Sequence, residues 1–187
     1  VDEGYARCAE FARRHSENFT VGSWMLPEGK RRLLYAIYTF CRLVDNLGDE
    51  FYGNRLTALD ELEQEVLSCY ESEPRNPYMV ALQDTIRTFD IPKEPFLRLI
   101  EANRMDQRKN RYDTYMDLQY YCEHSANPVG HLVLYVFGYG DVHRQRLSDY
   151  TCTALQLTNF WQDVVRDYNM GRIYIPMEDM AEFECSE

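Results

Sequence analysis

The strongest constraint on this chain is a helical repeat of apolar residues that runs through most of its length. Over residues 27–47, apolar side chains recur every three or four positions, and residues 56–71 repeat the pattern. Such a step places side chains on one face of an α-helix, whereas a half-buried strand requires strict alternation. Further helices are predicted over residues 3–16, 78–89, 94–110, 114–137 and 148–168. Because strand alternation, hairpin turns and internal repeats are missing from the sequence, the pattern predicts an all-α fold.

Length and charge narrow the classes of protein further. The 187 residues suit one domain with a substantial core, and no shift in composition marks a boundary, so residues 1–187 are predicted to form a single domain. Acidic residues outnumber basic ones, 31 to 20, for a net charge of −11, which disfavours nucleic acid as a partner because phosphate binding requires clustered positive charge.

Cysteine spacing and hydropathy predict the compartment. The six cysteines lie far apart without a C-x-x-C pair, which favours free thiols in a reducing environment. The sequence shows neither a signal peptide nor a run of 18 apolar residues. The expected location is the cytoplasm.

The segment CRLVDNLGDE places two carboxylates at the end of an apolar helix. Tyr38, Arg42, Asp45 and Asp49 are spaced i, i+4, i+7 and i+11, which forms one stripe along a single helix face. The apolar stripe of the same helix lies beside it, so these polar side chains border the core. Taken alone, the segment fits a solvated face with an Arg–Asp pair as well as it fits a metal site.

A second acidic stripe lies in LQLTNFWQDVVRDYNM, where Asn159, Asp163 and Asp167 are spaced i, i+4 and i+8. Carboxylate and carboxamide oxygens, with no nearby His or Cys, suit a hard cation such as Mg²⁺. If the two stripes faced each other, Mg²⁺ ions and a diphosphate would offset the repulsion between the carboxylates. The competing di-iron site of helical bundles is disfavoured, because none of the four histidines follows a glutamate by three positions.

Four segments, in order along the chain, resemble the motifs of the trans-isoprenyl squalene/phytoene synthase family. YAIYTFCRLVDNLGDE is similar to Y-A-x-Y-x-F-C-R-x-x-D-x-x-x-D, and LQLTNFWQDVVRDYNMGRIYIP to Q-L-T-N-x-x-x-D-x-x-x-D followed by G-R-x-Y-x-P. HSENF with the later LPEGKRR resembles H-S-x-S-F…L-P-x-x-x-R, and YCEHSANPVG resembles Y-C-x-Y-V-A-G-x-V-G. Within the family, HSENF, SANPVG and NFWQDV are most similar to the hydroxysqualene synthase branch of bacterial hopanoid pathways.

The resemblance implies a single-domain, all-α prenyl-synthase fold around a central cavity, and Mg²⁺-assisted loss of diphosphate. Family chains continue for several helices past AEFECSE, so this chain looks C-terminally truncated. The metal ligands implied by the motifs are Asp45, Asp49, Asn159, Asp163 and Asp167. The implied substrate contacts are His15, Asn18, Phe19, Tyr38, Arg42, Gln156 and Arg172. The implied catalytic residues are His124, Tyr174 and Tyr38.

Some positions depart from the family pattern. Gln162 stands where many members carry an arginine before the second acidic motif, and Arg166, one turn on, is the candidate replacement. His124 stands where synthases that couple two farnesyl diphosphates have a tyrosine implicated in proton removal. We expect a kink at Pro128 to turn His124 and Asn127 toward the cavity, where they would form a polar wall.

The expected activity is therefore conversion of presqualene diphosphate to hydroxysqualene, with loss of diphosphate and capture of water, using Mg²⁺ and no nicotinamide cofactor. The alternative within the family is head-to-head condensation of two farnesyl diphosphates to presqualene diphosphate, squalene or dehydrosqualene. Two non-enzymatic classes stay open, an inactive family member that acts as a scaffold and a helical interaction module whose acidic stripes are coincidental. Peripheral contact with a membrane for product release stays open as well. Asp106 is a lesser candidate for the cavity.

Overall fold

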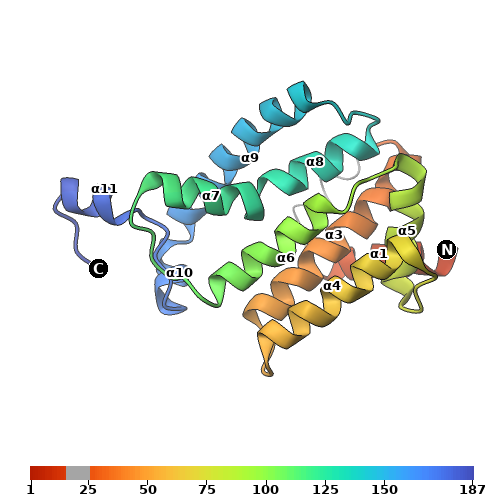
Figure 1. Cartoon of the computed structure of the whole chain (residues 1–187), viewed down its shortest axis with the longest axis horizontal. Helices are drawn as coiled ribbons and strands as arrows, with labels where there is room; N and C mark the ends of the chain where they lie inside the picture. Colours follow the sequence, from red (N-terminus) through yellow and green to blue (C-terminus); the bar gives the residue numbers. More distant parts are fainter. Residues whose placement is uncertain (16–25) are drawn as a thin grey trace.

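The computed structural model describes residues 1–15 and 26–187, and within those ranges it contains helices and no strand, which confirms the predicted all-α class (Figure 1). Its helices are α1 (Asp2–His15), α3 (Glu28–Asp49), α4 (Arg55–Glu71), α5 (Pro77–Phe89), α6 (Glu94–Asp106), α7 (Tyr115–Ser125), α8 (Asn127–Val136), α9 (Val142–Gln162), α10 (Val164–Asn169) and α11 (Met177–Glu182).

The main core surrounds α3, which packs against α1, α4, α5, α6 and α8. In Figure 1, α3, α4 and α6 run side by side, with α1 and α5 across one end. The apolar stripe predicted on α3 is buried at Leu33, Ile37, Phe40 and Val44. Phe40 meets Phe96 of α6 edge to face, with ring centroids 5.1 Å apart. Since burial of each such side chain contributes about 1.5–3 kcal/mol, the polar stripe beside this core is held on a rigid support.

Helices α3 and α6 approach each other closely where the first pair of aspartates lies. Gly48 is buried, and a Cβ atom built on it would lie 2.0 Å from the Asn103 Oδ1 atom of α6. The Gln107 Nε2 atom donates a hydrogen bond to the Gly48 carbonyl at 3.0 Å. A larger residue at this position would displace Asn103 or force the helices apart. Gly48, which lies between Asp45 and Asp49, therefore allows α3 to pack closely against α6 beside the two aspartates.

The single helix predicted over residues 114–137 is wrong, because the chain forms α7 and α8 with a break at Ala126. Ala126 has φ −117° and ψ −51°, which departs from regular helix geometry. Pro128 lies in the first turn of α8, where its missing N–H removes no helical hydrogen bond. Pro128 therefore marks the start of a new helix instead of a kink within one.

The helix predicted over residues 148–168 begins earlier and is interrupted. Asp141 caps the start of α9 by accepting a hydrogen bond from the Arg144 N–H at 3.0 Å. Asp163, with φ −98° and ψ 11°, separates α9 from α10. Hydrogen bonds from Asp163 N to Asn159 O, at 2.8 Å, and from Asp167 N to Asp163 O, at 2.9 Å, continue the helical pattern across this break. The order of the second acidic stripe is thus preserved. Helix α11 was not predicted, since six residues are too few to show a period.

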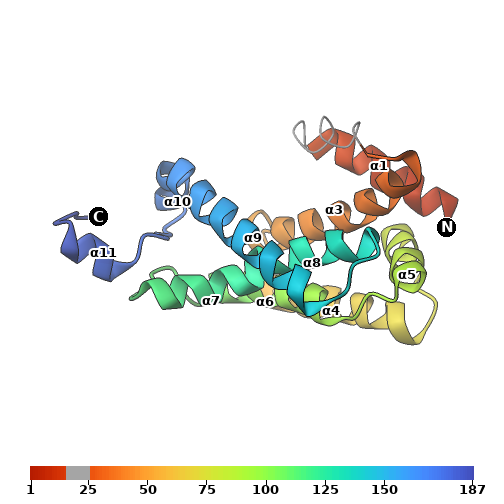
Figure 2. The same ribbon diagram turned by 90° about the horizontal axis from the view of Figure 1, so that it is seen from above.

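Helix α9 crosses α7 and α8 and packs against both (Figures 1 and 2). Within α9 and α10, all of which the structure describes, Phe160 is the single buried residue. Large apolar side chains such as Trp161, 66% exposed, and Val165, 70% exposed, remain on the surface. A second, smaller core is built mainly from aromatic rings and joins α9 to α6 and α7. It includes Tyr112, Tyr121, Phe160 and Tyr174.

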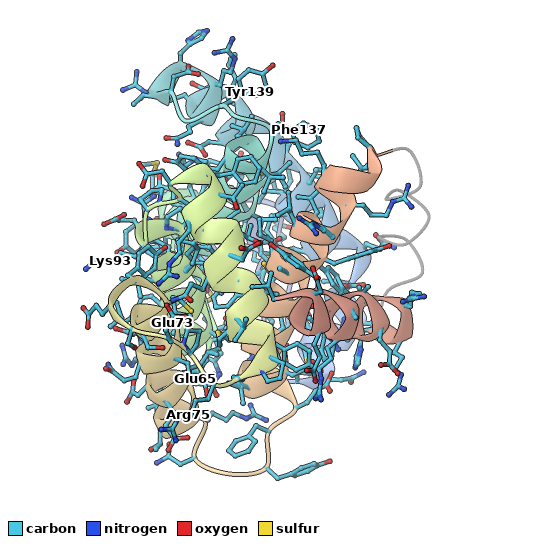
Figure 3. All side chains as sticks on the ribbon, turned by 90° about the vertical axis from the view of Figure 1, so that its right-hand side faces the viewer. Glu65, Glu73, Arg75, Lys93, Phe137 and Tyr139 are labelled. Carbon is cyan, nitrogen blue, oxygen red and sulfur yellow. The ribbon has the colours of Figure 1, made fainter. Side chains whose placement is uncertain are left out.

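Figure 3 views the molecule along its longest axis. The connection between α8 and α9 carries the exposed rings of Phe137 and Tyr139 on one side, whereas Glu65 of α4 and Glu73 and Arg75 of the α4–α5 turn lie lower in this view. The six cysteines are free thiols, as predicted. In the part of the chain that the structure describes, no helix has the length and apolar character to span a membrane.

Candidate functional site

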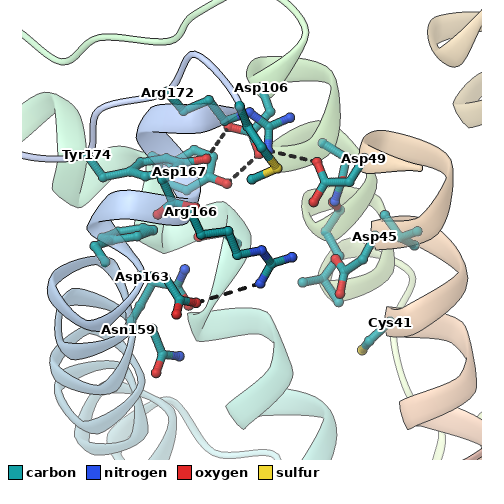
Figure 4. A pocket seen from close by; sticks show the side chains of 18 of the residues that line it. Cys41, Asp45, Asp49, Asp106, Asn159, Asp163, Arg166, Asp167, Arg172 and Tyr174 are labelled. Carbon is teal, nitrogen blue, oxygen red and sulfur yellow. Dashed lines mark hydrogen bonds and ion pairs between the residues drawn. The ribbon is translucent and has the colours of Figure 1, made fainter. Parts of the chain in front are cut away.

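A cavity of about 330 Å³, here called the aspartate cavity, lies between α3, α6 and α7 on one side and α9 and α10 on the other. Asp45 and Asp49 enter it from α3, and Asn159, Asp163 and Asp167 enter it from the facing segment (Figure 4). Helical spacing puts each group on one face, and the crossing of α9 over the bundle brings the two faces together. The predicted juxtaposition of the two stripes is present.

The carboxylates of this cavity disfavour one another's charged form. The side chain of Asp45 is open to the cavity, but protein surrounds it on its other sides. This burial, and next the charge of Asp49, raise the pKa of Asp45 from 3.8 to about 6, while Arg42 opposes the rise. Burial and the charge of Asp163 likewise raise the pKa of Asp167. Such repulsion between neighbouring carboxylates is relieved by a bound cation.

Arg172 is the internal counterion that joins the two walls. Its Nη1 atom lies 2.7 Å from the Asp49 Oδ1 atom, and its side chain is 10% exposed. Burial lowers the pKa of the guanidinium, but the negative charges of Asp106 and Asp49 outweigh that effect and raise it. The Arg172 backbone N–H also donates to the Asp167 carbonyl at 2.9 Å. This predicted substrate contact does line the cavity.

Further polar donors lie beside the acids. Arg42 and Gln156, both predicted substrate contacts, line the cavity, as does Arg166. The Arg42 Nη2 atom pairs with Glu50 at 2.9 Å, while its Nε atom is buried without a hydrogen-bond partner among the described residues. Figure 4 shows Arg166 reaching into the space between the stripes, where its Nη1 atom lies 3.8 Å from Asp163 Oδ2. Acceptors for a cation and donors for an anion therefore share one cavity.

One end of the cavity is formed by a carboxylate held between two phenols. The Tyr121 hydroxyl donates to Asp106 Oδ2 at 2.6 Å, and the Tyr174 hydroxyl donates to Asp106 Oδ1 at 3.0 Å. Burial raises the pKa of Asp106 to about 6, although the charge of Arg172 and the two phenolic hydrogen bonds oppose the rise. Phe160 stacks on Tyr174 with ring centroids 4.2 Å apart.

The sequence motifs predicted Tyr174 at this cavity, but Tyr121 was not predicted. The signal was present, because the motif Y-C-x-Y-V-A-G-x-V-G contains two tyrosines and the first of them is retained as Tyr121. Tyr121 and Ser125 are one turn apart, and these two residues of α7 line the cavity.

The expected inward position of His124 is wrong, because His124 does not line the aspartate cavity. Its Nδ1 atom lies 2.9 Å from the Tyr120 carbonyl oxygen, and its ring packs against the Tyr120 ring at 4.6 Å. The cavity-facing positions of α7 are taken by Tyr121 and Ser125, so His124 falls to one side of them.

Asn127 is also displaced from the expected polar wall. The helix break at Ala126 directs it toward α9, where its Oδ1 atom accepts a hydrogen bond from the Thr153 hydroxyl at 3.0 Å. Asn127 lines a separate cavity of about 710 Å³ instead.

Two predicted substrate contacts that the structure describes, His15 and Tyr38, do not line the aspartate cavity. His15 is exposed at the end of α1, where its ring stacks on Phe11 at 4.1 Å. Tyr38 packs against the main core and is not among the residues that line the cavity. Asn18 and Phe19 lie outside the described residues.

The donors of the aspartate cavity fit Mg²⁺ in kind, since they are carboxylate and amide oxygens. They are not gathered into a finished site, because no three acidic, histidine or cysteine side chains of the described residues converge on a metal position. Asp49 is held by Arg172 and Asp163 lies near Arg166, so arginines supply the compensating charge. Metal ligation would require these pairs to rearrange.

Comparisons with known proteins agree with the family resemblance seen in the sequence motifs. A sequence profile of the family "Squalene/phytoene synthase" matches residues 12–187. The chain is 34% identical to 15-cis-phytoene synthase of Synechococcus elongatus, with 100% of this chain and 65% of that protein covered. It is 33% identical to the chloroplastic phytoene synthase of Daucus carota, with 96% and 47% covered. The chain thus spans about half to two thirds of the length of these relatives.

Two solved structures share its fold. The crystal structure of squalene synthase HpnC from Alicyclobacillus acidocaldarius is 51% identical, with a TM-score of 0.94 and coverage of 98% of this chain and 70% of that chain. The crystal structure of a dehydrosqualene synthase in complex with ligand is 30% identical, with a TM-score of 0.88 and coverage of 99% and 65%.

Proposed function

Because the chain belongs to the squalene/phytoene synthase family, we propose that the aspartate cavity binds a prenyl diphosphate together with Mg²⁺ and ionises it by departure of diphosphate. The observation that carries this proposal is the convergence of two acidic stripes and a buried arginine on one cavity. When bound, Mg²⁺ would neutralise the charge that develops on the leaving diphosphate.

The residues divide into two roles in this proposal. The metal ions would be held by Asp45, Asp49, Asn159, Asp163 and Asp167. Diphosphate oxygens would be held by Arg42, Arg172 and Gln156, because guanidinium and amide N–H groups match phosphate oxygens in charge and direction. The buried Nε atom of Arg42, which has no hydrogen-bond partner among the described residues, would gain one if the side chain moved toward a bound diphosphate. Roles for His15, Asn18, Phe19 and Tyr38 stay predictions.

For the reaction itself, we propose conversion of presqualene diphosphate to hydroxysqualene. The 51% identity to a structure named as a squalene synthase, compared with 34% to a phytoene synthase, supports a squalene-type reaction. The resemblance of HSENF, SANPVG and NFWQDV to the hydroxysqualene synthase branch supports this particular step. Water can quench a cation without a hydride donor, so this route requires no nicotinamide cofactor. The stacked rings of Phe160 and Tyr174 offer π-faces that would stabilise a cation without bonding to it.

A second candidate is head-to-head condensation of two farnesyl diphosphates, and the position of Tyr121 favours it. That reaction requires removal of a proton, and Tyr121 provides a phenol beside a carboxylate within the cavity. The substitution at His124 therefore does not favour a single-step enzyme, since a tyrosine of the same motif, Tyr121, lines the cavity.

The test is incubation of the purified protein with Mg²⁺ and, separately, presqualene diphosphate, farnesyl diphosphate or geranylgeranyl diphosphate, followed by identification of the products. We expect hydroxysqualene from presqualene diphosphate without NADPH. Accumulation of presqualene diphosphate from farnesyl diphosphate would favour the second candidate. Absence of diphosphate release from all three substrates would contradict an enzyme.

Because the chain spans only part of the length of its relatives, ligand binding is measured as well as turnover. We expect Mg²⁺ and inorganic pyrophosphate together to raise the melting temperature, with a smaller effect from either alone, because each supplies the charge that the other requires. The same rise in Asp163→Asn would contradict the assigned site. A scaffold or interaction module would show no coupling between the two ligands.

A further inference from the structure

We infer that Asp106 is a positioning residue that receives, through the Tyr121 hydroxyl, the proton released when the carbocation is quenched. This inference rests on the proposed function and adds to it the group that takes up the proton. Asp106 does not itself touch the reacting carbon in this proposal, because both of its oxygens are occupied by phenols.

The geometry suits transfer of a proton and disfavours covalent capture. A free carboxylate beside a carbocation would attack it and form an ester. Here Asp106 borders the cavity, but each of its oxygens already accepts a hydrogen bond from a phenol, one from Tyr121 and one from Tyr174, which lowers their nucleophilicity. A phenol hydroxyl is a weaker nucleophile than a carboxylate, and it accepts and donates a proton through the same oxygen.

Tyr121 is the better conduit of the two tyrosines. Its hydrogen bond to Asp106 is 2.6 Å long, which lies in the short range of O–H···O⁻ bonds, whereas that of Tyr174 is 3.0 Å. Tyr174 is also fixed between aromatic neighbours, at 4.2 Å from Phe160 and 5.7 Å from Tyr112. We assign Tyr121 to proton transfer and Tyr174 to covering the second oxygen.

Surrounding charges keep the carboxylate balanced between its two states. Burial and the charge of Asp49 favour the protonated form, while Arg172 and the two phenolic hydrogen bonds stabilise the ionised form. The other groups around it are the phenols of Tyr121, Tyr174 and Tyr112, and the latter two rings stack on each other. An acid in this environment can accept a proton in one step and return it in the next.

The proton balance is complete within the chain. Water forms the new C–O bond, one of its protons moves to the Tyr121 oxygen, and the proton of Tyr121 moves to Asp106 Oδ2. The O–H bonding electrons remain on the product oxygen, Tyr121 ends unchanged, and Asp106 ends protonated until solvent removes the proton. In cyclopropane closure the same relay would take a proton from carbon, and the C–H electrons would form the C–C bond.

The experiment separates ionisation from quenching. The substrate carries ¹⁸O at the bridging oxygen of its diphosphate, and the protein is the full chain as wild type, Asp106→Asn, Tyr121→Phe or Tyr174→Phe. Product is measured together with migration of ¹⁸O to non-bridging positions in recovered substrate. Asp106→Asn keeps size and shape but cannot take up the proton.

We expect Asp106→Asn and Tyr121→Phe to lower product formation about 100-fold, the usual contribution of a general base, while ¹⁸O migration continues because the cation returns to diphosphate. Tyr174→Phe should lose only about fivefold, the value of one hydrogen bond. The thermal shift with Mg²⁺ and pyrophosphate checks that each variant folds. If Asp106→Asn does not fold, Tyr121→Phe alone tests the inference.

Two outcomes would overturn the inference. Unchanged product formation in Asp106→Asn and Tyr121→Phe would show that another base, such as the departing diphosphate, takes the proton. An equal fall of product formation and ¹⁸O migration would show that Asp106 only supports the structure or substrate binding. Failure of the proposed function is distinct from both, since the wild type would then show neither product nor ¹⁸O migration.

Discussion

The two walls of the aspartate cavity are built in different ways. The first, on α3, carries Asp45 and Asp49 on a helix that packs against α1, α4, α5, α6 and α8, with its apolar stripe buried. The second, on α9 and α10, is anchored by one buried side chain, Phe160, and leaves Trp161 and Val165 exposed. The first wall is held by apolar packing.

The second wall depends on polar ties to the first. Arg172 reaches from the segment after α10 to Asp49, and Tyr174 reaches to Asp106 on α6. Stability and function therefore overlap at this contact between the walls, because Asp49, which would hold a metal, now holds Arg172. The contrast teaches that equivalent acidic motifs on the two walls should respond differently to the same substitution.

The largest expected effect is on activity. Asp49→Asn and Asp167→Asn should each lower kcat/KM for presqualene diphosphate about 100- to 1,000-fold at saturating Mg²⁺, since each removes a charged ligand. Without metal the two should diverge in urea unfolding. Asp49→Asn should cost about 1–2 kcal/mol by removing the partner of Arg172, whereas Asp167→Asn should cost nothing or stabilise slightly by removing repulsion. Near-normal turnover in either variant would refute its role as a ligand.

The next effect compares neighbours on α9. Phe160→Ala should destabilise the fold by about 3 kcal/mol, because it removes the single buried anchor of this helix and its stacking on Tyr174. Trp161→Ala, the matched control at a position 66% exposed, should change the free energy of unfolding by less than about 0.5 kcal/mol. Equal losses in thermal or urea unfolding would mean that α9 buries more of its surface in solution.

A somewhat smaller effect is expected from loss of the ion pair between Arg172 and Asp49, which joins the two walls. Arg172→Met should destabilise the metal-free protein by about 2 kcal/mol, as it leaves Asp49 and Asp106 without their counterion. Hydrogen exchange should speed up over residues 163–176 and stay slow in α3. Arg166→Met is the control, since Arg166 is exposed and lies 3.8 Å from its carboxylate. Uniform acceleration across both walls would mean that they unfold together.

The smallest expected effect depends on pH. Because the pKa of Asp45 is raised from 3.8 to about 6, its contribution to the stability of the metal-free protein is fully present below about pH 4 and is lost as pH rises through 6. Asp45→Asn should therefore match the wild type near pH 3 and exceed it by about 1 kcal/mol at pH 7.5, a value reduced for exposure to the cavity. Urea unfolding at the two pH values measures the difference. A variant that is less stable at pH 7.5 would contradict the raised pKa.

Much of the fold and part of the site followed from local pattern. The apolar stripe of α3 was predicted from its period, and so were the ends of most helices to within one or two residues. The break at Ala126 was not, because Pro128 is compatible with both a kink and a new helix start. That difference turned Asn127 toward α9, whereas His124 lies off the cavity because Tyr121 and Ser125 take the cavity-facing positions of α7.

What the sequence by itself determined is which polar residues share a helix face, since 3.6 residues per turn place Asp45 beside Asp49, and Asn159 beside Asp163, wherever the helices pack. Only the tertiary structure decided what stands opposite them. Arg172 pairs with Asp49 across 123 positions of chain, and Tyr174 reaches Asp106 across 68. These partners are chosen by how α9 crosses the bundle, and that crossing depends on the packing of many distant side chains rather than on any local period.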